Sequence, residues 1–133
     1  MERNNEKGNI KINDNIFGRL VLDAIGLTEG KAFPASEKGK LLSGIGGTSP
    51  GAGEIADNMI IREEEDGSLY MQWYIIMSFG SSIHRVTRIM LDHVEKEIRA
   101  MFPGQPGRLV LRIVGVKSRK IAVRDLEVER QWN

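Results

Sequence analysis

The sequence contains no cysteine, and this absence narrows the chemistry that is open to the chain. Disulfide bonds, thiolate metal sites and cysteine nucleophiles are all excluded, and a reducing compartment fits the composition. The longest unbroken apolar run, Trp73 to Met77, is much shorter than the roughly 20 residues that a membrane-spanning helix needs. Residues 1–8 are polar and lack the apolar stretch of a secretory signal. We therefore expect a cytoplasmic protein that reaches a membrane only peripherally, through a partner.

An excess of charge of one sign is also absent. Nineteen Lys and Arg residues face eighteen Asp and Glu residues, so the formal net charge is +1. No global field steers such a chain toward nucleic acid or anionic lipid, and there is no strong nucleic-acid signal. The length of 133 residues and the 41% hydrophobic content suit one compact domain. We expect a polar tail over residues 1–8 and a single domain over residues 9–130.

The first periodic segment predicts a strand and a helix. Ile10 and Ile12 alternate with polar neighbours as in a short strand, and Asp14 can then cap a helix. Apolar residues recur at helical spacing over residues 16–25. Gly26 marks the predicted end of this helix.

The segment from Leu27 to Gly53 has little periodicity. We expect at most one short helix there, over residues 36–42, and a glycine-rich loop over residues 43–53. The loop lacks the third glycine of the dinucleotide fingerprint, and Gly39-Lys40 is followed by leucine rather than by the Ser or Thr of a P-loop. Its Gly44-Ile-Gly-Gly47 has the spacing of a KH clamp, but no helical pattern follows. We interpret the loop as a flexible connector and keep a ligand-binding loop as the alternative.

Two apolar runs predict a β-hairpin. They cover Met59 to Ile61 and Leu69 to Phe79, and Asp66-Gly67 between them is a favourable turn pair. Alternation in the second run predicts one core face and one polar face. The core face consists of Leu69, Met71, Trp73, Ile75, Met77 and Phe79, and the other face carries Tyr70, Gln72, Tyr74 and Ser78.

The remaining chain predicts a long helix and two more strands. Ser81 or Ser82 can cap a helix whose apolar stripe is Ile83, Val86, Met90, Val94, Ile98 and Met101. Residues 103–107 hold two prolines and cannot continue it. Strands follow over residues 108–114 and 121–128, the second with a break near Arg124-Asp125. We predict the α+β class, a two-layer sandwich in which two amphipathic helices cover a mixed β-sheet.

Several of these segments resemble the bacterial alkaline shock, or envelope stress response, protein family. The resemblance rests on Tyr74-Ile-Ile-Met-Ser-Phe-Gly80, on the helical stripe that follows it, and on a strand that closes in Gly115-Val116. The opening Gly8-Asn-Ile-Lys-Ile12 also looks like the start of the family. The resemblance implies a non-catalytic cytoplasmic protein, typical of Gram-positive bacteria, that assembles with itself or is tethered by an integral-membrane partner. It carries over no catalytic residues.

Residues for catalysis or metal binding are few. The two histidines, His84 and His93, are nine residues apart on one helix and therefore point to opposite faces. His93 and Glu97 could both reach one ion, but two ligands make an incomplete site, and we interpret them as a surface pair. We expect no catalytic site, no metal and no cofactor, and hence no enzyme.

Charge is distributed unevenly along the chain. Residues 54–66 carry six acidic residues and one arginine, whereas residues 108–124 carry six basic residues and no acidic one. Two solvated surfaces or an interface would each explain this pattern. The predicted interface residues are Glu63, Glu64, Glu65, Arg112, Arg119 and Lys120. We expect a scaffold protein that forms a homo-oligomer. The alternative is a nucleic-acid or small-anion binding module that uses the basic C-terminal strands and the glycine-rich loop.

Overall fold

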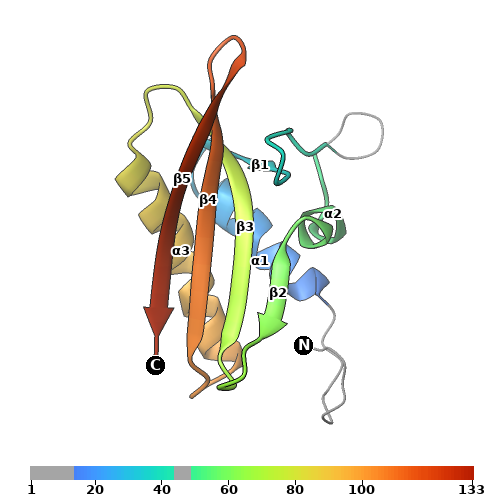
Figure 1. The fold of residues 1–133 in the computed structure, drawn as a ribbon, viewed down its shortest axis with the longest axis vertical. Helices are drawn as coiled ribbons and strands as arrows, with labels where there is room; N and C mark the ends of the chain where they lie inside the picture. The colour runs from blue at the N-terminus through green and yellow to red at the C-terminus, as the bar shows by residue number, and fades with distance from the viewer. Residues whose placement is uncertain (1–13, 44–48) are drawn as a thin grey trace.

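A computed structural model describes residues 14–43 and 49–133 of the chain. The predicted strand at Ile10 and Ile12 lies outside these residues. The elements in chain order are α1 (Asn15–Gly26), β1 (Ala32–Ala35), α2 (Ala52–Asp57), β2 (Ile60–Glu63), β3 (Leu69–Ser78), α3 (Ile83–Met101), β4 (Gly107–Lys117) and β5 (Ile121–Trp132). Figure 1 shows that α1 and α3 lie on one side of the sheet. The predicted α+β class is confirmed.

The five strands form one mixed sheet with the order β1-β3-β4-β5. β1 pairs with residues 74–77 of β3, and β2 pairs with residues 69–72 along the same edge. β3 and β4 are parallel, and every other pair is antiparallel. Parallel neighbours need a crossover connection, and α3 supplies it. The predicted hairpin is confirmed as β2 and β3, with Gly67 at a φ of 87° in its turn. A positive φ of this size suits glycine because it has no Cβ.

The core lies between the sheet and the helices because both contribute one apolar face. Leu69, Met71, Trp73, Ile75 and Met77 of β3 are all buried there, as the alternation predicts. On α3 the core positions include Met90, Val94 and Ile98, which are 0–1% exposed. The Ser82 hydroxyl accepts a hydrogen bond from the backbone N–H of Arg85, which confirms the predicted cap.

Two predicted core residues are exposed instead. Phe79 is 75% exposed because β3 ends at Ser78, so the alternation of the strand no longer governs the next residue. Met101 is 38% exposed because it is the last residue of α3. Only the part of each stripe that faces another element is buried.

The prediction for residues 27–53 is wrong in three places. β1 pairs with β3, although four residues give too short a pattern to detect. Residues 36–40 form a tight turn rather than a helix, because Gly39 has a φ of 87° and Leu41 pairs back to Ala35. α2 begins at Ala52, inside the predicted glycine-rich loop, and residues 44–48 of that loop lie outside the described part of the chain.

β5 is longer than predicted and reaches Trp132. The predicted break near Arg124-Asp125 corresponds to a register shift, where Ile113 pairs with Leu126 but Gly115 pairs with Val123. Such a bulge puts an extra residue into one strand without ending it. No helix in the described ranges is long and apolar enough to cross a membrane.

Candidate functional site

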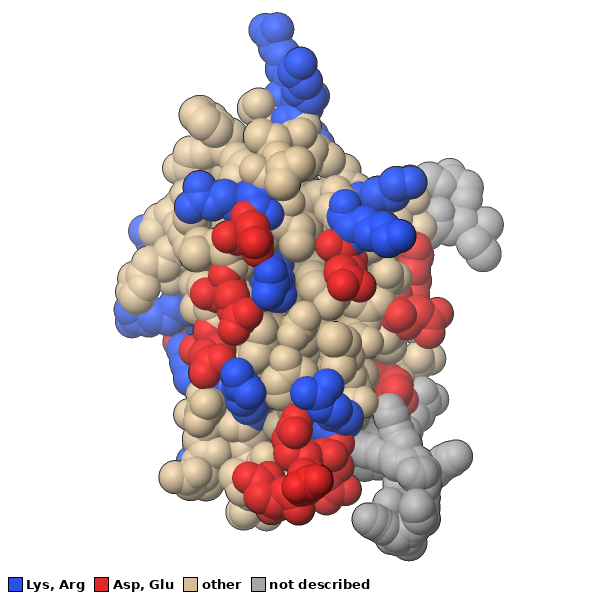
Figure 2. All heavy atoms as spheres, viewed as in Figure 1, with Lys and Arg blue, Asp and Glu red and all other residues tan. Residues whose placement is uncertain are grey.

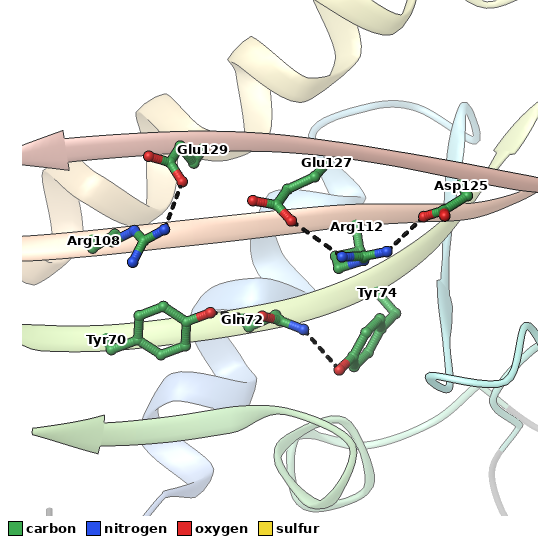
Figure 3. Close-up of polar contacts among 8 residues, drawn as sticks. All are labelled: Tyr70, Gln72, Tyr74, Arg108, Arg112, Asp125, Glu127 and Glu129. Atoms are coloured by element: carbon green, nitrogen blue, oxygen red, sulfur yellow. Dashed lines mark hydrogen bonds and ion pairs between the residues drawn. The ribbon is translucent and has the colours of Figure 1, made fainter. Parts of the chain in front are cut away.

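The face of the sheet that points away from α1 and α3 carries a chain of polar side chains (Figure 3). The Tyr70 hydroxyl donates to the Gln72 side-chain oxygen at 2.6 Å, and the Gln72 amide donates to the Tyr74 hydroxyl oxygen at 2.9 Å. Both rings are nearly buried, at 7% and 6% exposure. The two tyrosines are therefore held along β3 and are not free platforms for base stacking.

Tyr70 lies under two guanidinium groups. The Arg62 and Arg108 guanidinium carbons lie 4.2 Å and 5.5 Å from the centroid of its ring, within the range of cation–π contacts. Burial raises the pKa of Tyr70, and the positive charges of the two arginines oppose that rise. The phenol therefore stays neutral, and its ring is a surface on which the side chains of Arg62 and Arg108 pack.

The arginines of β4 are paired with carboxylates of β5. Arg108 donates to Glu129 at 2.9 Å, and Arg112 donates to Glu127 at 3.1 Å and to Asp125 at 2.5 Å (Figure 3). The hydrogen bond between Arg108 and Glu129 raises the pKa of the arginine and lowers that of the carboxylate. The basic surface predicted for these strands is therefore largely neutralised by their own neighbour.

A groove of about 620 Å³ lies on the same face, between the turn of residues 36–40 and the β4–β5 hairpin. Tyr74, Gln72, Arg112 and Val114 belong to its lining. The groove also carries charges of both signs, from Glu37, Lys38, Arg124, Arg112 and Asp125. The near balance of charge gives this groove no clear preference for an anion or a cation.

The end of the sheet at the β4–β5 turn is both basic and apolar. We call Phe79, Lys117, Arg119, Lys120, Ile121 and Val123 the basic end. The Phe79 N–H donates to the Lys117 carbonyl at 2.9 Å, Lys117 pairs with Ile121, and Gly115 pairs with Val123, so these residues lie at the same end of the sheet. Val123 is 91% exposed. Within residues 14–43 and 49–133, neither Arg119 nor Lys120 has an ion-pair partner.

The opposite end of the sheet is acidic. Because β3 and β4 are parallel, the β2–β3 turn precedes Leu69 at one end, while the β4–β5 turn follows Lys117 at the other. Ten residues of β3 separate the two ends by about 30 Å. Figure 2 shows basic side chains projecting at the upper end and acidic side chains gathered at the lower end.

A second groove, of about 560 Å³, lies at this lower end. We call it the acidic groove. Its lining consists of Glu64, Glu65, Asp66, Ser68, Pro106, Gly107, Arg108, Gln131, Trp132 and Asn133. Hydrogen bonds from the Ser68 hydroxyl and backbone N–H lower the pKa of Asp66. Arg62 pairs with Glu64 at 2.9 Å, and Glu65 is exposed.

The histidines do not form a shared site. His84 is exposed beside a shallow groove on α3, whereas His93 is partly buried. The predicted contact between His93 and Glu97 is not among the hydrogen bonds and ion pairs of the described residues. In the same part of the chain, no three His, Asp or Glu side chains gather as ligands for a metal ion.

The structure therefore separates the predicted interface residues into three places. Glu63, Glu64 and Glu65 are at the acidic end, and Arg119 and Lys120 are in the turn at the basic end. Arg112 lies between them in mid-strand and is occupied by two carboxylates. The sequence reasoning missed the exposed apolar side chains of the basic end. The glycine after Phe79 was the available signal that β3 ends there.

Comparisons of the chain with protein-family models, with curated proteins and with solved structures gave no match. The resemblance to the alkaline shock family therefore stays a prediction from the residues.

Proposed function

We propose that this chain is a non-catalytic scaffold protein of the cytoplasm that acts through self-association. The role that the resemblance implies, in an envelope or alkaline stress response, is part of the proposal. The observation that carries it is the exposure of Phe79 and Val123, on either side of β4, at the end of the sheet that also carries Arg119 and Lys120. Ile121 and Val123 both line the groove beside the β4–β5 turn, and clustered exposed apolar side chains of this kind mark contact sites.

The charge of the chain is compatible with association between copies. A formal net charge of +1 produces little repulsion between identical molecules. At such a contact the apolar side chains supply much of the affinity, and the exposed charges mainly set the encounter rate and the register. An integral-membrane tethering partner, which the resemblance also implies, would use the same kind of contact.

The nucleic-acid and small-anion alternative receives less support. Its basic strands would have to present Arg108 and Arg112, but Glu129, Glu127 and Asp125 already occupy these guanidinium groups. Tyr70 and Tyr74 are too buried to stack on bases. Salt-dependent retention of the protein on single-stranded nucleic acid would favour this alternative over the scaffold.

Sedimentation across a range of protein concentrations tests the proposal. We expect the average mass of the parent protein to rise with concentration at low salt. The double variant Phe79→Ser with Val123→Ser should lose most of this association while keeping its melting temperature, because both side chains are exposed. Ile16→Ser, at an exposed position on α1, is the matched control and should associate like the parent.

A parent protein that stays monomeric at high concentration and low salt would overturn the proposed function. Association that survives the double variant unchanged would show that another surface carries it.

A further inference from the structure

We infer that the basic end of one copy docks in the acidic groove of the next copy, so that the molecules associate head to tail. This inference rests on the proposed self-association and names its two surfaces. Both surfaces belong to the described part of one chain, and they differ in shape and in sign of charge. Each therefore has a complement on every other copy.

The charges of the two surfaces are complementary. The turn between β4 and β5 presents Arg119 and Lys120, which are exposed and have no ion-pair partner among the described residues. The acidic groove presents Glu65 and Asp66, and the Asp66 carboxylate is held in place by hydrogen bonds that it accepts from the Ser68 hydroxyl and backbone N–H. Complementary potentials of this kind steer two surfaces together and suppress the wrong pairings. Two basic ends, or two acidic grooves, would repel each other.

The shapes also fit. The β4–β5 turn projects beyond the rest of the sheet in Figure 1, whereas the acidic groove is a hollow of about 560 Å³. Pro106 and the small exposed part of Trp132, which is 9% exposed, give one side of the groove an apolar edge that can receive Ile121 beside the turn. An apolar contact surrounded by opposite charges is the usual composition of a specific protein interface.

The position of the two surfaces determines the type of assembly. They lie at opposite ends of the sheet, about 30 Å apart along the strands. A contact between different patches is heterologous, and it leaves one basic end and one acidic groove unoccupied after each addition. The assembly therefore continues to grow unless rotation between copies closes it into a ring.

Charge reversal of each surface in the full-length chain tests this arrangement. The turn variant carries Arg119→Glu and Lys120→Glu, and the groove variant carries Glu64→Lys and Glu65→Lys. The association constant of each variant alone should fall by about tenfold or more. In each variant the turn of one copy and the groove of the next carry charge of the same sign and repel each other. An equimolar mixture of the two variants should associate again, since every contact in an alternating assembly then joins opposite charges.

The turn variant should also terminate growth of the parent protein. Its groove still accepts the basic end of a parent molecule, but its own turn is rejected by the next groove. Adding it in small amounts should therefore lower the average mass of parent assemblies. The matched control is Arg88→Glu with Lys96→Glu on the exposed side of α3, which changes the net charge equally and should leave association unchanged.

The possible results separate this inference from the proposed function. Loss of association in both charge variants, recovery on mixing and shortening by the turn variant support the docking. Association of the parent that neither reversal weakens would overturn the docking but leave self-association in place. A parent protein that does not associate at all would overturn both. If either reversal unfolds the chain, Arg119→Gln with Lys120→Gln gives the same test without introducing a like charge.

Discussion

Val94 is the residue whose replacement tests the central contact between α3 and the sheet. Its side chain is fully buried at 0% exposure, in the cluster that also contains Trp73. Val94→Ala removes the equivalent of two buried methylene groups, which costs about 1.6 kcal/mol in transfer free energy. The cavity that remains raises the loss of unfolding free energy to about 2–3 kcal/mol. For a chain of this length the melting temperature should fall by about 10 °C.

Urea unfolding and thermal melting followed by tryptophan fluorescence measure this effect, because Trp73 is buried at 1% exposure. Lys96→Ala, on the exposed side of the same helix, should stay within about 0.5 kcal/mol of the parent. Val94→Asp and Met90→Asp should cost several kcal/mol more than an alanine, because each buries an unpaired charge. If Val94→Ala and both aspartate variants melt like the parent, the packing of α3 on the sheet is wrong.

Two further predictions concern the lower end of the sheet. A Cβ at Gly107 would collide with the Trp132 indole, so Gly107→Ala should displace that ring and break its hydrogen bond to the Gln105 carbonyl. The tryptophan emission should then shift to the red. Gly26→Ala is the control, because a Cβ at Gly26 meets open space and should leave the emission unchanged. Asp66 has a lowered pKa in the folded state, so its stabilising contribution is present above the ordinary Asp pKa and is lost as pH falls through the folded value. Ser68→Ala should raise this pKa in an NMR titration, and an unchanged midpoint would contradict the assigned cause.

The long elements could be predicted from the sequence because their patterns are local. In α3 the apolar residues from Val86 to Ile98 repeat over several turns, and in β3 the alternation covers ten residues. These patterns depend only on which side of the element meets the core. The patterns fail at Phe79, which follows the last residue of β3, and at Met101, which is the last residue of α3.

The short elements could not be predicted because their stability comes from contacts distant in sequence. β1 has four residues, and its backbone pairs with residues 74–77 of β3. α2 has six residues and packs against α1 where Gly18, which has no side chain, allows the Ala52 backbone to approach. Neither contact leaves a periodic signal in its own segment, and isolated helices of this length are marginal.

The charges of the candidate site depended on strand register, which the sequence pattern leaves open. Arg108 and Arg112 of β4 lie 13 to 21 positions before the carboxylates of β5 with which they pair, so the chain reads as one basic segment followed by one acidic segment. The β4–β5 pairing brings Arg112 opposite Glu127, and the register shift places Asp125 within reach of the same guanidinium. Arg119 and Lys120 in the turn have no opposite strand position and no ion-pair partner among the described residues.

The same register argues against the simplest alternative mode of association, in which the exposed edges of two β5 strands pair with each other. An uncovered edge strand is the usual place for such pairing. However, Asp125, Glu127 and Glu129 form one acidic row on β5, and a twofold pair would place the row of one copy beside the same row of the other. Like charges opposite each other destabilise a strand pair. Arg108 and Arg112 pair with these carboxylates and reduce the repulsion, so the acidic row disfavours edge pairing only in part. The proposed contact between the two ends of the sheet meets no such cost, because its two surfaces carry opposite charges.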